Sequence, residues 1–83
     1  MTLHRPISII ARDITLAWAN PTYSAKPYLA AMRQLSSINE HFGADDARSI
    51  VLHFLSNAAS WRGPAAKELK AELRQITLTH RAG

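Results

Sequence analysis

Four basic side chains near the end of the sequence are spaced so that they could bind phosphate groups together. Lys67, Lys70 and Arg74 follow one another at intervals of three and four residues, and Arg81 continues the series. At about 100° per residue these positions fall within roughly 60° of one another on a helix. The stripe predicts, as one of two interpretations, a nucleic-acid-binding face made by Arg62, Lys67, Lys70 and Arg74.

The other interpretation of this stripe is an ordinary solvated helix face. Exposed helix faces are usually charged, and cations near a helix C-terminus complement its dipole. Glu68 and Glu72 lie on the opposite flank of the same segment and would repel a phosphate that came close. Nucleic-acid binding is therefore the alternative function and not the first.

A tryptophan-arginine pair, Trp61-Arg62, stands directly before the helix-breaking Gly63-Pro64. A buried Trp61 would close the end of a helical bundle, since tryptophan covers a large apolar area. An exposed pair would instead form a docking surface, because Trp and Arg are frequent interface hot spots. If a partner binds, the expected contacts are Trp61, Arg62, Tyr23 and Tyr28.

Catalytic, cofactor-binding and metal-binding residues are not expected. The four histidines, at positions 4, 41, 53 and 80, include no pair with the i, i+4 spacing of a helical metal site, and the chain has no cysteine. Each of the six acidic residues has a capping or surface role available, so the groups needed for a catalytic site do not assemble in the sequence. We expect no enzyme and no small-molecule substrate.

The composition is that of one small folded domain covering residues 1–83. The chain is 47% apolar, carries a net charge of +4 and has a pI of about 10.1, which favours an anionic partner. A domain of this size without disulfides is marginally stable alone, and oligomerisation is a usual remedy. No apolar run is long enough to cross a membrane or to act as a signal peptide, so we expect a cytoplasmic protein.

Proline and glycine divide the chain into four expected helical segments. Their approximate ranges are 7–19, 26–39, 45–59 and 64–78, with a frayed tail at 79–83. Period-two alternation is absent, so the expected fold is an all-α bundle without a sheet. We expect three long helices and a shorter or irregular first element. Expected N-caps are Ser24 for the second segment and Asp45 or Asp46 for the third.

Apolar residues recur at helical spacing in every segment. The expected core faces contain Ile7, Ile10, Ile14 and Trp18, then Tyr28, Met32, Leu35 and either Ile38 or Asn39, then Ala47, Ile50, Val51, Phe54, Leu55 and Ala58, and finally Ala66, Leu69, Leu73 and Ile76. Ile9 and Leu16 form a second apolar strip on the first segment, which favours contact with another subunit. The third segment is too apolar to be the recognition helix of a helix-turn-helix.

Four stretches carry a family resemblance: ANPTYSAKPYLAAM (19–32), FGADDARSIV (42–51), SWRG (60–63) and AKELKAEL (66–73). In these the chain resembles small uncharacterised all-helical proteins encoded in bacteriophages and prophages of enteric bacteria. The resemblance implies a bacterial cytoplasm or an infected host cell, and an accessory protein that binds a host or phage macromolecule. The first expected function is thus non-catalytic protein interaction, with a homodimer as one form of it.

Overall fold

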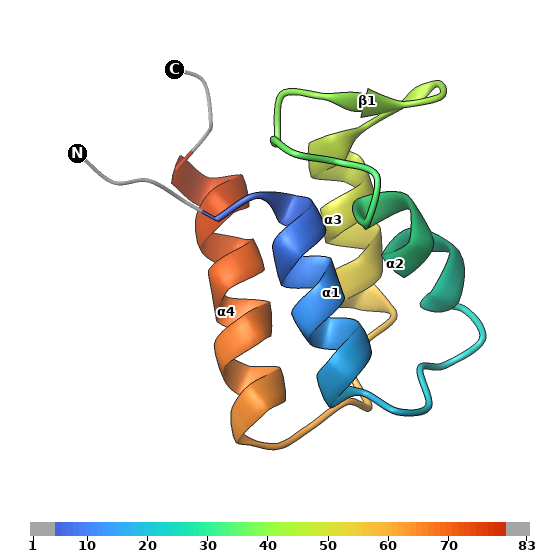
Figure 1. The fold of residues 1–83 in the computed structure, drawn as a ribbon, viewed down its shortest axis with the longest axis vertical. Coiled ribbons are helices and arrows are strands. Elements are labelled where there is room, and N and C mark those ends of the chain that lie inside the picture. Colours follow the sequence, from blue (N-terminus) through green and yellow to red (C-terminus); the bar gives the residue numbers. More distant parts are fainter. Residues whose placement is uncertain (1–4, 80–83) are drawn as a thin grey trace.

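The computed structural model describes residues 5–79, which form four helices and one short β-hairpin (Figure 1). In chain order these are α1 (Ile7–Ala17), α2 (Lys26–Met32), β1 (His41–Phe42), β2 (Asp45–Asp46), α3 (Ala47–Ser56) and α4 (Pro64–Thr79). The expected helical bundle is confirmed. Of the tail predicted at 79–83, Thr79 still belongs to α4, and residues 80–83 lie outside the described range.

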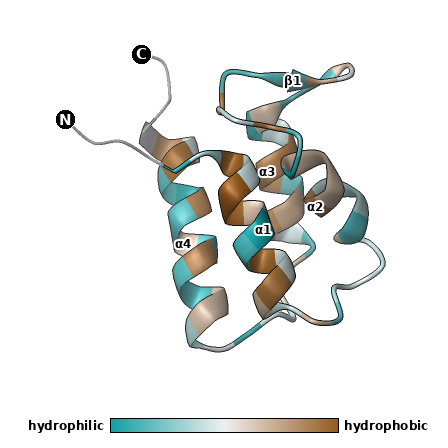
Figure 2. Ribbon diagram, viewed as in Figure 1, coloured by the Kyte–Doolittle hydropathy of each residue, from teal (hydrophilic) through white to brown (hydrophobic). Residues whose placement is uncertain are grey.

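The four helices enclose one apolar core. Helix α1 packs against α2 and α4, and α3 packs against the same two helices (Figure 1). The largest fully buried side chains are Phe54, Ile7, Ile10, Ile14, Met32, Leu35, Leu73 and Val51. Brown, hydrophobic segments predominate on α1 and α3, whereas brown and teal, hydrophilic segments alternate along α4 (Figure 2). The apolar spacing of the sequence predicted most of the core. Leu29 is buried although it was not expected to be, and five of the expected core residues are only partly buried: Trp18, Tyr28, Ile38, Leu55 and Leu69.

Helix α1 is a regular helix of 11 residues, so the expectation of a shorter or irregular first element is wrong. It follows Pro6, which provides no side-chain cap. Backbone carbonyls from a distant loop replace the cap: the amide of Ile7 donates to the oxygen of Ser36 at 3.2 Å, and that of Ser8 to the oxygen of Leu35 at 2.7 Å. Free amides at a helix start need such acceptors.

Helix α2 is the short one, with seven residues, and ends at Met32 instead of near residue 39. Beyond Met32 the chain leaves the helix, and the carbonyls of Leu35 and Ser36 cap α1. The predicted cap Ser24 is also wrong. Helix α2 follows Ala25 without a side-chain cap, and the nearby support is Thr22, whose hydroxyl accepts from the amide of Ala25 at 3.3 Å.

The hairpin between α2 and α3 corrects the expectation that the chain has no sheet. His41 pairs with Asp46 and Phe42 with Asp45 in antiparallel register. Gly43 takes a φ of 66° in the two-residue turn, as glycine does readily. Paired strands of two residues are too short to show an alternating sequence pattern.

Helices α3 and α4 set the geometry of the candidate site. Asp46 caps α3 as predicted, because its carboxylate accepts from the amide of Ser49 at 2.7 Å. Pro64 opens α4, where its missing N–H has no helical partner to lose. Among the helices of residues 5–79, none has the length and apolarity to cross a bilayer.

Candidate functional site

An open groove of about 640 Å³ lies where the turn after α3 meets the first half of α4. Four cationic side chains line it: Arg62, Lys67, Lys70 and Arg74. The rest of the wall is formed by Trp61, Gly63, Pro64 and Ala66. We refer to it as the basic groove. The structure thus brings together all four residues of the nucleic-acid interpretation, while Arg81 lies outside the described residues.

Helix α4 positions three of these cations on one face. Lys67, Lys70 and Arg74 lie at intervals of three and four residues, and Ala66, Leu73 and Ile76 bury the face that holds the helix on the core. Seven residues of helix rise about 10 Å. The cations from Lys67 to Arg74 are therefore spread along the groove, and Arg62 joins them from the preceding turn.

The formal net charge of the protein equals the charge of the basic groove. Ten lysines and arginines are opposed by six acidic residues, giving +4. Four of the ten lysines and arginines line the groove. The groove therefore concentrates positive charge on one surface.

No acidic side chain within residues 5–79 forms an ion pair with the groove's cations. Asp13 and Glu72 instead pair with Arg5. Burial lowers the pKa of Lys70 below its ordinary value, and the nearby charges of Arg74 and Arg62 lower it further. Arg74 and Arg62 therefore repel Lys70, and an anion bound among these three side chains would relieve this repulsion.

Trp61 lies at the floor of the groove and belongs to the core. Its side chain is 6% exposed and its ring stacks on Trp18, with 5.1 Å between centroids and 7° between planes. Trp18 in turn meets Phe54 edge-on at 6.3 Å. The structural interpretation of Trp61 is therefore confirmed: it closes the end of the bundle beneath the Gly63-Pro64 turn.

The four predicted partner contacts do not form one surface. Trp61 and Arg62 both line the basic groove. Tyr23 precedes α2 and is 91% exposed. Tyr28 lies on α2, half-buried, and stacks on His53 at 5.4 Å. Of this set, only Arg62 is both exposed and part of a groove.

A second groove, of about 440 Å³, lies on the other flank of α4 against α1. It is lined by Arg5, Asp13, Leu16, Ala17, Ala65, Glu68, Leu69 and Glu72, and we refer to it as the acidic groove. Arg5 donates to Asp13 at 2.7 Å and to both carboxylate oxygens of Glu72 at 2.8 Å. These two carboxylates raise the pKa of Arg5, Glu72 more than Asp13.

Sequence reasoning missed Arg5, because its bond to Glu72 joins positions 67 residues apart. Leu16 of the second apolar strip lies in the acidic groove and is 78% exposed, whereas Ile9 is half-buried. Within the described part of the chain, no group of three or more His, Asp or Glu side chains could hold a metal ion.

No protein-family model, curated protein or solved structure matches this chain significantly. What the protein does must therefore be argued from the two grooves.

Proposed function

We propose that the protein is a non-catalytic binding protein that holds the phosphate backbone of a nucleic acid in the basic groove. One observation carries the proposal: four cations that have no acidic partner among residues 5–79 line a single open groove. Lysine and arginine contacts to phosphate, with release of counterions, supply most of the affinity of such binding.

The shape of the groove supports an extended ligand. Arg62, Lys67 and Arg74 are exposed side chains, and the last two are separated by about 10 Å along the helix axis. A single phosphate needs cations that converge on one point, whereas a backbone presents charges in a row. Glu68 and Glu72, which would repel phosphate, line the acidic groove on the opposite flank.

The buried state of Trp61 supports binding without base recognition. Proteins that grip single strands through their bases offer exposed aromatic faces for stacking. One face of Trp61 is covered by Trp18, and its side chain is almost completely buried. Contacts to phosphate fix position but carry no sequence information. We therefore expect similar affinities for different sequences of equal length.

A fluorescence-anisotropy titration tests this function. Labelled duplex and single-stranded DNA of about 20 nucleotides are titrated with protein from about 50 to 200 mM salt. We count one phosphate contact for each of the exposed cations Arg62, Lys67 and Arg74. Three contacts predict that log K falls with log salt at a slope of about −2.7 for duplex and about −2.1 for single strands. Absence of binding at about 50 mM salt refutes the proposal.

A matched pair of variants localises the binding. The double variant Lys67→Gln, Arg74→Gln removes two charges from the groove. The control Arg12→Gln, Arg33→Gln removes two charges from exposed sites that do not line it. If only the groove variant loses affinity and shows a shallower slope of log K against log salt, the DNA binds in the basic groove. Equal losses in both pairs mean that only the net charge matters.

Protein interaction, including self-association, is the second candidate function, and exposed Leu16 in the acidic groove favours it. Burying a leucine contributes about 1.5–3 kcal/mol, so a partner covering Leu16 would gain from it. Light scattering at micromolar concentration should show a dimer that Leu16→Asp dissociates. A strict monomer for the unchanged protein contradicts self-association.

The setting that we propose is a bacterial cytoplasm or an infected host cell, with the protein acting as a phage or prophage accessory. The resemblance of residues 19–32, 42–51, 60–63 and 66–73 to phage and prophage proteins supports this setting. A nucleic-acid ligand fits it, and a pull-down from bacterial lysate with and without nuclease distinguishes nucleic acid from a protein partner.

A further inference from the structure

We propose that Lys70 is a positioning residue, which ties α4 to the turn after α3 and thereby presets the basic groove, while Arg62, Lys67 and Arg74 contact the phosphates. The inference rests on the proposed function and assigns different roles to four cations that the sequence presents as equivalent.

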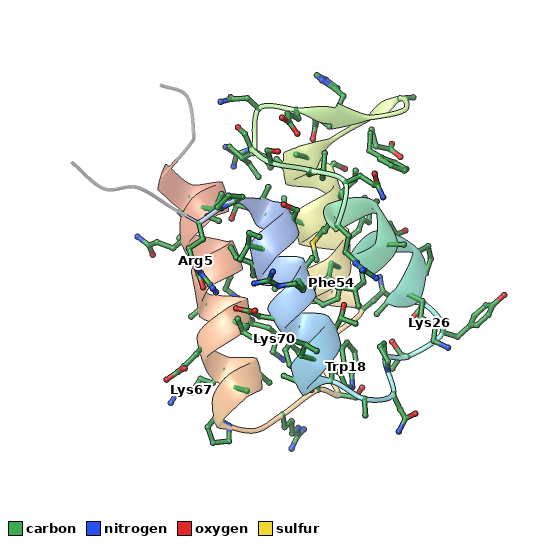
Figure 3. All side chains as sticks on the ribbon, viewed as in Figure 1. Arg5, Trp18, Lys26, Phe54, Lys67 and Lys70 are labelled. Atoms are coloured by element: carbon green, nitrogen blue, oxygen red, sulfur yellow. The ribbon has the colours of Figure 1, made fainter. Side chains whose placement is uncertain are left out.

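The hydrogen bonds of Lys70 point inward. Its ammonium donates to the backbone oxygen of Ala58 at 2.9 Å and to that of Trp61 at 2.7 Å. An ammonium has three donors, so two of them are already used within the protein. Figure 3 shows Lys70 toward the interior of the bundle and Lys67 on the outer side of α4.

The two carbonyls that Lys70 binds belong to one turn. The oxygen of Ala58 also accepts from the amide of Trp61 at 3.1 Å. Lys70 and this amide therefore both stabilise the turn formed by residues 58–61. Carbonyls just beyond a helix end lack helical partners, and a lysine can satisfy them. Lys70 thus fixes the backbone from which Arg62, the next residue, enters the groove.

Lys70 also lies against the tryptophan pair. Its ammonium is 5.9 Å from the centroid of the Trp61 ring, close enough for an attractive cation–π contact. Trp61 stacks on Trp18, and these are the two tryptophans of the chain. A change at Lys70 should therefore alter tryptophan emission, whereas a change at Lys67 should not.

The electrostatic setting agrees with a structural role. Lys70 is half-buried beside two arginines, a place where a cation is unfavourable unless other contacts compensate. Two carbonyl acceptors and an aromatic face offset part of this cost. A lysine that contacted phosphate would instead extend into solvent, as its flexible stem allows.

The test compares Lys70→Met with Lys67→Met in the full chain. Lys70→Met should change the tryptophan emission of the free protein and weaken DNA binding about tenfold, equivalent to about 1.4 kcal/mol, while the salt slope stays as in the unchanged protein. Lys67→Met should leave emission unchanged and reduce the slope for duplex by about 0.9. Unchanged emission in Lys70→Met together with a reduced slope overturns the inference.

A milder variant covers the case in which Lys70→Met does not fold. The amide of Lys70→Gln can still donate to one of the two carbonyls, and smaller changes in the same directions are expected. If the unchanged protein binds no DNA, the proposed function fails. The emission of the Lys70 variants then still decides whether the residue holds the turn.

Discussion

The charged side chains on the two flanks of α4 are arranged differently. On the flank facing α1, Arg5 pairs with Asp13 and Glu72 through three short hydrogen bonds. On the other flank, Arg62, Lys67 and Arg74 have no acidic partner among residues 5–79. Opposite charges that pair within the protein need no ligand, whereas a row of like charges gains free energy when an anion binds.

The flanks also differ in how their apolar residues are used. Trp61 at the floor of the basic groove is buried against Trp18, while Leu16 in the acidic groove is left open to solvent. The basic groove therefore has a buried aromatic floor and cations without an acidic partner among residues 5–79. The acidic groove has two carboxylates paired with Arg5 and an exposed apolar side chain. This difference favours an anion for the first and an apolar protein surface for the second.

The largest expected effect comes from removing the floor of the basic groove. Trp61→Ala deletes a buried ring and should lower the free energy of unfolding by about 3–5 kcal/mol. Leu16→Ala in the acidic groove is the matched control and should change it by less than about 0.5 kcal/mol. Denaturant unfolding measures both. A loss under about 1 kcal/mol for Trp61→Ala would mean that the ring contributes little to the core.

The next largest effect is expected on DNA binding when Arg62, which lines the basic groove just before α4, is changed. Arg62→Glu replaces an attractive contact with a repulsive one and should weaken DNA binding about tenfold or more at low salt. Arg33→Glu makes the same charge change on an exposed site that lines neither groove and should have a much smaller effect. Equal losses would show that the groove has no special role.

The basic groove could be predicted from sequence because its parts are local. Lys67, Lys70 and Arg74 share one helix, and helical spacing places them on one face without knowledge of the fold. The inward direction of Lys70 could not be predicted, since it depends on the carbonyls of Ala58 and Trp61, which the α3–α4 turn brings close.

The errors in the predicted fold have the same physical origin. Helix α2 was expected to extend to about residue 39, and local propensity gives no reason to stop it at Met32. The residues after Met32 instead make a tertiary contact that local propensity does not encode: the carbonyls of Leu35 and Ser36 accept from the first amides of α1. The acidic groove was missed similarly, since Arg5 and Glu72 meet only when α1 packs on α4.

A smaller effect is expected from opening the ion pairs of the acidic groove. Arg5→Met removes the two-pronged contact to Glu72 and the contact to Asp13. All three side chains remain partly exposed, so the free energy of unfolding should fall by only about 0.5–1 kcal/mol. The loss should shrink as salt rises, because salt screens exposed pairs. DNA affinity should stay unchanged, and a large loss would mean that the two flanks are coupled.

The smallest expected effect is a pH dependence of the free energy of unfolding, which we expect from Lys70 in the basic groove and not from Arg5 in the acidic groove. Burial and two arginines lower the pKa of Lys70 from the ordinary 10.5. Between the lowered pKa and 10.5, the unfolded chain binds more protons at this site than the folded one. The free energy of unfolding of the unchanged protein, relative to that of Lys70→Met, should therefore rise with pH in this alkaline window and level off above 10.5. As the pH falls back through the lowered pKa of Lys70, this gain should disappear. Arg5→Met should show no such trend, because arginine stays protonated there. Thermal unfolding across the window measures the difference, and a stability gap independent of pH would contradict a half-buried Lys70.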